Sequence, residues 1–215
     1  MSNFFNIREI NHSLFKFINE FFGKNGFDHL MVILSEIFNP QIIIYQSLAI
    51  TLACLYYLFL IRKNNSFKKQ FLLITETLSS FFVSASIILI IVLIIKHYTL
   101  VERPFCHLKN IYVIDKIIST SKCNHSFPSG HTTIAVIMIA SFWPLFTNFF
   151  KFIAVILLIL VSISRIVSGA HYPFDIFGAI VIALPLTLYI RNRLNHFINY
   201  YNDKYNLFDK FLRHK

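Results

Sequence analysis

The sequence is poor in charged residues and in glycine. Asp, Glu, Lys and Arg make up only 14% of its 215 residues, whereas soluble proteins carry about 25%. The small number of glycines, five in the whole chain, argues against a Gly-rich nucleotide-binding fold. Hydrophobic residues reach 56% and the mean hydropathy is +0.61, so lipid is the expected solvent for most of the chain.

Cysteine is also scarce. The three cysteines, Cys54, Cys106 and Cys123, form no CxxC pair, which argues against a structural zinc site. No cluster of Asp, Glu and His stands at metal-ligand spacing, so we expect neither a metal nor another cofactor. A cleavable signal peptide is not expected, because Arg8 and Glu9 interrupt the N-terminus before an apolar core can form.

The net charge of +10 would suggest nucleic acid as the partner of a soluble protein. A membrane protein instead collects Lys and Arg in its cytoplasmic loops. We therefore expect membrane lipids, and no nucleic acid, as partners.

Long apolar runs dominate the chain. Five are close to the roughly 20 residues that a helix needs to cross a bilayer: Gln41–Ile61, Phe71–Ile95, Thr132–Phe150, Phe152–Ile166 and Phe174–Ile190. Backbone groups in lipid must be paired within the chain, which leaves helices as the option for such runs. The sequence predicts an all-α, polytopic transmembrane helical bundle of about five spans.

The regions that flank the spans differ in character. Apolar residues recur at helical spacing from Ile7 to Phe22, which predicts an amphipathic helix on the membrane surface. We expect residues 1–40 to form interfacial amphipathic helices, residues 41–190 the transmembrane domain, and residues 191–215 a basic cytoplasmic tail.

Basic residues suggest the orientation of the spans. They occur at Arg62–Lys69, at Lys151 and after Ile190, and an odd number of spans places these three regions on one face. The positive-inside rule makes that face cytoplasmic. The opposite face also carries basic residues, so the count alone does not decide the orientation.

Three polar clusters occupy span ends, where ionisable residues point to function. In the first, Lys96 and Arg103 are seven residues apart and would share a helix face if the helix continued beyond the apolar run, which would make an anion clamp. Lys96 could instead reach to the membrane interface.

The second cluster precedes the third apolar run. Ser129 is a candidate helix N-cap and Gly130 permits close approach of a ligand to a helix start that suits phosphate. His131 would stand beside that phosphate. A simple helix cap with a solvated histidine is the alternative.

The third cluster joins the last two runs. Arg165 offers a guanidinium fork for phosphate oxygens, and Asp175 can hold the tautomer of His171 so that one ring nitrogen is free to attack. The alternative is a structural histidine–carboxylate pair. The topology brings all three clusters to one side of the membrane, which favours a shared site.

These segments read KHYTLVERP, PSGH and SRIVSGAHYPFD. They resemble the complete three-part signature of the type-2 phosphatidic acid phosphatases, which vanadium haloperoxidases share. The resemblance implies a metal-independent lipid phosphatase in which His171 is the nucleophile, Asp175 orients it, and His131 protonates the leaving group. It also implies phosphate binding by Lys96, Arg103, Ser129, Gly130 and Arg165.

The context of these motifs resembles the bacitracin-resistance type of undecaprenyl pyrophosphate phosphatase, although that group often has Asp where this chain has Gly130. Undecaprenyl pyrophosphate is therefore the first expected substrate, with phosphatidylglycerophosphate, phosphatidic acid and lipid A phosphates as alternatives. Transfer of the phosphate to another lipid, or anion binding by a carrier without catalysis, are other possible functions.

The predicted location is the inner (plasma) membrane with the site facing the periplasm or cell exterior. Cys106 and Cys123 lie in the loop assigned to that oxidising side and are a candidate disulfide, with two free thiols as the alternative. Cys54 is expected to stay a buried thiol. The remaining histidines receive no role: His12, His29, His97, His107, His125, His196 and His214.

Overall fold

A computed structural model describes residues 2–23, 26–64, 66–114 and 122–205 of the chain. Within these residues all regular structure is helical. The helices are α1 (Ser2–Gly23), α2 (Asp28–Ile37), α3 (Ile43–Ile61), α4 (Phe67–Thr99), α5 (Pro104–His107), α7 (Gly130–Phe142), the 3-10 helix η1 (Trp143–Leu145), α8 (Asn148–Val167) and α9 (Pro173–Tyr205).

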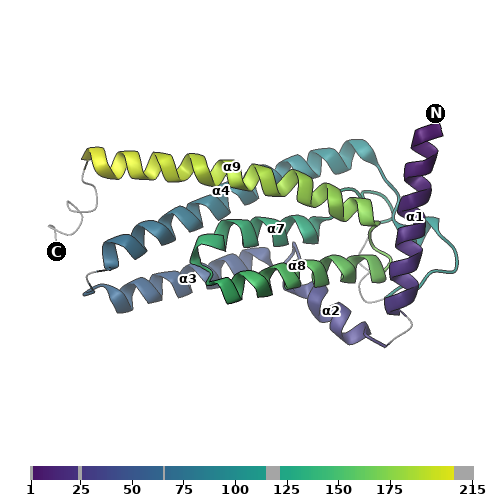
Figure 1. Cartoon of the computed structure of the whole chain (residues 1–215), viewed down its shortest axis with the longest axis horizontal. Helices are drawn as coiled ribbons and strands as arrows, with labels where there is room; N and C mark the ends of the chain where they lie inside the picture. Colours follow the sequence, from purple (N-terminus) through teal and green to yellow (C-terminus); the bar gives the residue numbers. More distant parts are fainter. Residues whose placement is uncertain (1, 24–25, 65, 115–121, 206–215) are drawn as a thin grey trace.

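Four of the described helices are long and apolar enough to cross a membrane, namely α3, α4, α8 and α9. They run roughly along the long axis of the molecule, with α7 among them (Figure 1). The predicted all-α transmembrane bundle is confirmed.

The predicted span Thr132–Phe150 is wrong in its boundaries. Helix α7 ends at Phe142, a 3-10 turn containing Pro144 follows, and α8 begins at Asn148. Pro144 cannot donate a helical hydrogen bond, and the Thr147 hydroxyl accepts from the Phe150 backbone N–H (3.5 Å) to cap α8. The reversal of the chain therefore falls inside the predicted run.

Helix α7 is the central element of the bundle. It has 13 residues, of which nine are buried, and it contacts α4, α8 and α9. Its length of about 20 Å is less than the roughly 30 Å apolar thickness of a bilayer. Because other helices cover it, α7 can end inside the protein, and its N-terminus lies at a fixed place among the neighbouring helix ends.

Helix α1 lies across one end of the bundle, transverse to the long helices (Figure 1). It is two-faced: Phe15 and Asn19 are 0% and 1% exposed, whereas Phe17 and Phe21 are 68% and 59% exposed. The buried face packs against α8 and α9. The amphipathic pattern of the sequence thus corresponds to a helix with a protein-facing side and an apolar outer side.

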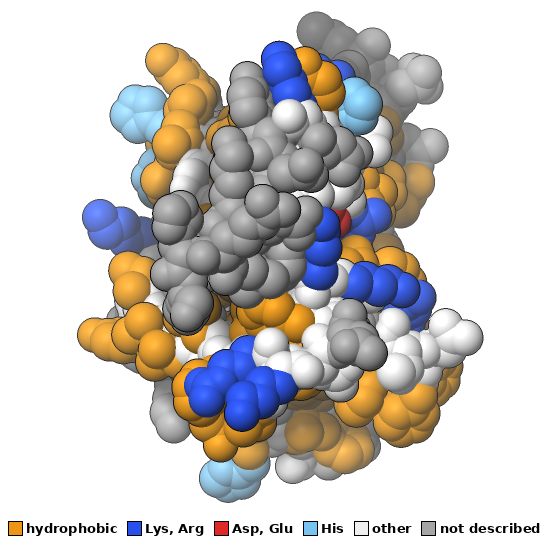
Figure 2. Space-filling model, turned by 90° about the vertical axis from the view of Figure 1, so that its left-hand side faces the viewer, with side chains coloured by type: hydrophobic (Ala, Val, Ile, Leu, Met, Phe, Trp, Pro, Cys, Tyr) orange, Lys and Arg blue, Asp and Glu red, His pale blue; other side chains and the backbone are white. Residues whose placement is uncertain are grey.

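Helix α9 is longer than its predicted span. It continues beyond Ile190 to Tyr205, so the segment predicted as a tail begins as helix. Residues 206–215, with Lys210, Arg213 and Lys215, lie outside the described residues. Figure 2 views the end of the bundle away from α1, where Lys and Arg side chains are spread over the surface and acidic ones are scarce.

Candidate active site

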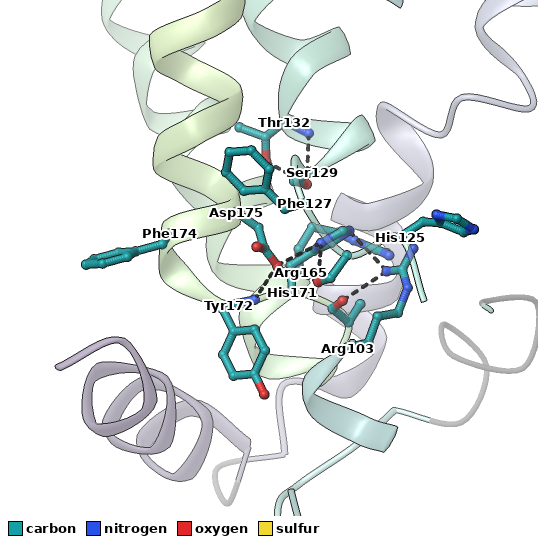
Figure 3. A network of polar contacts seen from close by, with 12 residues as sticks. Arg103, His125, Phe127, Ser129, Thr132, Arg165, His171, Tyr172, Phe174 and Asp175 are labelled. Carbon is teal, nitrogen blue, oxygen red and sulfur yellow. Dashed lines mark hydrogen bonds and ion pairs between the residues drawn. The ribbon is translucent and has the colours of Figure 1, made fainter. Parts of the chain in front are cut away.

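The three polar clusters meet at the end of the bundle that α1 covers (Figure 3). Helix α4 ends just after Lys96 and leads to Arg103, the first turn of α7 carries His131, and the turn between α8 and α9 carries His171. These segments are distant in the sequence, and the antiparallel packing of their helices brings them together.

His171 and Asp175 form a buried pair. The His171 side chain is 2% exposed and its Nδ1 lies 3.4 Å from Asp175 Oδ2. The carboxylate also accepts from the Tyr172 backbone N–H at 2.8 Å. On the other side of the ring, His171 Nε2 lies 3.1 Å from Arg103 Nη1. Asp175 thus favours the proton on Nδ1, which leaves the Nε2 lone pair for a ligand held by the arginine.

The electrostatics of this pair favour a neutral imidazole. Burial, with the added repulsion of Arg103, Lys96 and Arg165, lowers the pKa of His171 well below its ordinary value of 6.5. A neutral imidazole is the nucleophilic form, since protonation would remove the free lone pair.

The turn that carries His171 has a defined local structure. Helix α8 ends at Val167, and Gly169 adopts a positive φ of 76°, which suits glycine because it has no Cβ. A Cβ at Gly169 would also come within 3.0 Å of Val113. Pro173 then begins α9 with its fixed φ. The glycine and the proline together end one helix and begin the next.

Arg165 and Arg103 are hydrogen-bonded to neutral groups. Guanidinium N–H donors therefore remain available for a ligand. Arg165 is 3% exposed, and its Nη1 donates to Ser35 Oγ at 2.5 Å. Its buried Nε has no hydrogen-bond partner among the described residues. Arg103 donates to the carbonyls of Lys122 and Ala170, each at 2.9 Å. A buried, unpaired guanidinium N–H is unusual, and an oxyanion would satisfy it.

Lys96 is fixed by an exchange of hydrogen bonds with His125. The ammonium donates to the His125 carbonyl at 2.7 Å, and the His125 ring Nδ1 lies 2.7 Å from the Lys96 carbonyl. His125 therefore has a structural task that its sequence context did not indicate. It holds the end of α4 against the segment that leads into α7.

The first turn of α7 provides the remaining groups. Ser129 is buried and caps the helix, accepting from the Thr132 backbone N–H at 3.5 Å, while its own backbone N–H donates to the Asp175 carbonyl at 3.1 Å. A Cβ at Gly130 would meet only Pro40, at 3.7 Å, so the space beside it is open. The half-buried His131 follows directly. N–H groups of a first helical turn lack helical partners and suit an anion.

Two buried serines belong to the site and were missed by the sequence analysis. Ser126 Oγ donates to Asp175 Oδ2 at 2.5 Å and lies 3.4 Å from His171 Nδ1. Ser35 contacts Arg165 from 130 residues away in the chain. Proximity to the PSGH motif could have drawn attention to Ser126, but nothing in the sequence indicates Ser35.

A disulfide joins Cys106 to Cys123. It ties α5, directly after Arg103, to the segment before Ser126. The Arg103 backbone N–H also donates to the Cys123 carbonyl at 2.8 Å. The bridge thus supports the loop that carries one phosphate-binding candidate, while Cys54 is a free thiol.

Fold and site together define an integral-membrane phosphatase. The chain matches the PAP2 superfamily over residues 76–197, which include all three clusters. Since the match covers more than half of the sequence, the chain belongs to the PAP2 superfamily.

A solved structure supports the same fold. The crystal structure of Aquifex aeolicus LpxE is similar with a TM-score of 0.63 and 19% identity, over 84% of this chain and 94% of that one. No curated protein gives a significant match.

Proposed function

We propose that the protein removes the terminal phosphate of a membrane lipid through a phosphohistidine on His171, with undecaprenyl pyrophosphate as the substrate. The observation that carries the proposal is the buried His171–Asp175 pair, whose free Nε2 lies beside Arg103. The unpaired Nε–H of Arg165 is a second donor that an oxyanion bound beside His171 would satisfy.

In the first step, His171 Nε2 forms a bond to the terminal phosphorus as the bond from phosphorus to the bridging oxygen breaks. Asp175 holds the Nδ1 proton and stabilises the positive charge that develops on the ring. His131 gives its proton to the departing oxygen, so the lipid leaves with one phosphate fewer.

In the second step, water attacks the phosphohistidine. Neutral His131 takes a proton from the water as the new P–O bond forms and the P–N bond breaks. Inorganic phosphate is released and His171 returns to its starting state. Lys96, Arg103, Arg165 and the first turn of α7, with Ser129 and Gly130, stabilise the negative charge on the equatorial oxygens.

The position of the site suits a lipid. It lies at the ends of membrane-crossing helices, where a headgroup at the interface can reach it while its chain remains among lipid tails. Each buried CH₂ contributes about 0.8 kcal/mol, so a long prenyl chain binds far better than a soluble phosphate ester. Three cations suit a pyrophosphate, because its second phosphate is the charged leaving group.

The test compares phosphate release by the purified protein from a polyprenyl pyrophosphate, phosphatidylglycerophosphate, phosphatidic acid and lipid A at equal surface concentration. We expect the prenyl pyrophosphate to be fastest and His171→Ala to abolish turnover of all four. Fast turnover of another lipid and none of the prenyl pyrophosphate contradicts the substrate choice alone. Retained activity in His171→Ala contradicts the mechanism.

Independence from metal remains a prediction. No group of three His, Cys, Asp or Glu side chains in the described part of the chain could hold a metal ion. We expect activity to persist in EDTA. Loss in chelator that a divalent metal restores contradicts the scheme.

We further propose that the site faces the periplasm or cell exterior. The basic surface in Figure 2 lies at the opposite end of the bundle and suits the cytoplasmic side. In a Cys54→Ser background that keeps the Cys106–Cys123 bridge, Asn110→Cys should react with a membrane-impermeant thiol reagent in intact cells. Asn202→Cys should not, and the reverse pattern contradicts this orientation.

A further inference from the structure

Helix α1 contacts both ends of the turn that carries His171. The first contact is Asn19, whose side chain is 1% exposed. Its amide donates to the carbonyls of Val167 (2.9 Å), Ile166 (3.4 Å) and Tyr112 (2.8 Å). Carbonyls in the last turn of a helix have no helical donor. Asn19 therefore caps the C-terminus of α8 from a separate helix.

The second contact is Asn11. Its Oδ1 accepts from the Phe174 backbone N–H at 3.1 Å, in the first turn of α9. An N-terminal N–H of this kind is the usual target of a side-chain cap. The cap is again supplied by α1.

Between the two asparagines, α1 packs on the neighbour of the nucleophile. The fully buried Phe15 makes an edge contact with Tyr172 at a ring-centroid distance of 5.5 Å, and His12 stacks on the same ring at 5.1 Å. Figure 3 shows the Tyr172 ring pointing away from Asp175, on the side where α1 passes. Asn11, Phe15 and Asn19 are spaced by four residues and therefore share one face of α1.

The turn held in this way supplies the reacting groups. Arg165 lies in the last turn of α8, Asp175 in the first turn of α9, and His171 between them. The separation of these two helix ends sets the position of His171 relative to Asp175 and Arg165. Small displacements of reacting groups are costly in catalysis.

We propose that α1 is a positioning element for catalysis, with Asn11 and Asn19 as the positioning residues that fix the two helix ends around His171. The inference rests on the proposed function of His171 and Asp175. It assigns α1 a task beyond contact with the membrane surface, because the asparagines lie on its protein-facing side.

The two asparagines predict opposite responses to the same change. Among the described residues Asn11 uses only its acceptor oxygen, so Asn11→Asp should keep the cap and Asn11→Ala should lose it. Asn19 uses its amide donors on three carbonyls, so Asn19→Asp sets a carboxylate against carbonyl oxygens. We therefore expect Asn11→Asp to restore the rate that Asn11→Ala loses, and Asn19→Asp to abolish the rate.

The experiment measures kcat, KM and the unfolding temperature of the full-length protein in detergent with its best lipid substrate. We expect Asn11→Ala to lower kcat about tenfold with KM unchanged, and Asn11→Asp to stay within about twofold of wild type. Asn19→Ala should lower kcat about 100-fold, since several hydrogen bonds are lost. The control is Asn199→Ala, which removes an exposed hydrogen bond to Glu76 (3.0 Å) at the far end of the bundle.

A purely anchoring α1 would give another result. If both alanine variants keep the wild-type kcat and change only KM or the unfolding temperature, the inference is wrong. The inference is also wrong if Asn11→Asp does not restore the rate that Asn11→Ala loses. If the buried Asn19 variants do not fold, the Asn11 variants alone decide the inference. An inactive wild-type protein contradicts the proposed function, whereas an active wild type with unaffected asparagine variants contradicts this inference alone.

Discussion

The two ends of the bundle are built on different principles. At the site end, the polar and ionisable side chains of His171, Asp175 and Arg165 are at most 3% exposed, and Arg165 and Asp175 make short hydrogen bonds to Ser35 and to the Tyr172 backbone. At the far end, Lys and Arg side chains reach outward (Figure 2), and α4 and α9 share an exposed Asn199–Glu76 hydrogen bond. Burying polar groups costs free energy unless each is paired, so the site end tolerates few changes and the far end tolerates many.

The largest contrast is expected for carboxylates. Asp175→Asn should lower kcat by about 10⁴, as loss of the orienting carboxylate does in a Ser-His-Asp triad. Glu76→Gln, the same change at the far end, should leave kcat unaltered. Phosphate release by both variants measures this directly. A loss below tenfold in Asp175→Asn would place the orienting role elsewhere.

The disulfide provides the next contrast. Replacing both Cys106 and Cys123 by serine should lower the free energy of unfolding by about 3 kcal/mol, because it removes the cross-link of a 17-residue separation. Cys54→Ser on α3 is the matched control and should have little effect. Unfolding in detergent with and without reductant compares them. Equal stability of the bridged and bridge-free proteins would show that the hydrogen bonds of Arg103 suffice to hold the loop.

A serine pair tests the hydrogen bond to Asp175. Ser126→Ala removes the donor to Asp175 Oδ2 and should lower kcat about tenfold, the effect of one hydrogen bond to a charged group. Ser86→Ala removes an exposed hydroxyl that bonds to the Phe82 carbonyl within α4 and should be neutral. Steady-state kinetics of the two variants make the comparison. Equal rates would mean that Tyr172 and His171 alone orient the carboxylate.

The smallest effect concerns pH. His171 must be unprotonated to attack, and its pKa is lowered from 6.5 by burial and nearby cations. His171 therefore stays unprotonated and reactive as the pH falls through the ordinary histidine range. It loses its reactivity only at lower pH. The fraction of His171 in the reactive, unprotonated form should change less than about twofold between roughly pH 7.5 and 6.5, as measured by NMR titration of its ring. A titration midpoint near 6.5 assigned to His171 would contradict the strong burial effect.

The sequence predicted the site end better than the architecture around it. Lys96, Arg103, His131, His171 and Asp175 could be selected because ionisable groups at span ends are costly and hence few. The topology of alternating spans then brought them together. The residues proposed to react were therefore accessible to reasoning from hydropathy and residue type.

Contacts across long sequence distances could not be predicted. The Ser35–Arg165 and Asn19–Val167 hydrogen bonds depend on how α1 and α2 pack against α8, and side-chain packing leaves no periodic signal. The early end of α7 within the predicted span Thr132–Phe150 was missed because a buried helix and a lipid-facing helix are equally apolar. Pro144 indicated a break, but hydropathy alone continued across it.

Helices α4 and α9 have 33 residues each and lie in contact, so both are about 50 Å long and exceed the roughly 30 Å hydrocarbon core. The segment Pro173–Ile190 accounts for about 27 Å of α9 and matches that core. The rest of α9, beginning at Arg191, together with the first turns of α4, should then project into water on the face opposite the site. The protein would carry a two-helix stalk there, whose aromatic residues Phe197, Tyr200 and Tyr201 are 57%, 53% and 38% exposed. Hydrophobic mismatch would therefore be relieved by protrusion, and a thicker membrane would draw the stalk inward or reduce the tilt of the helix pair.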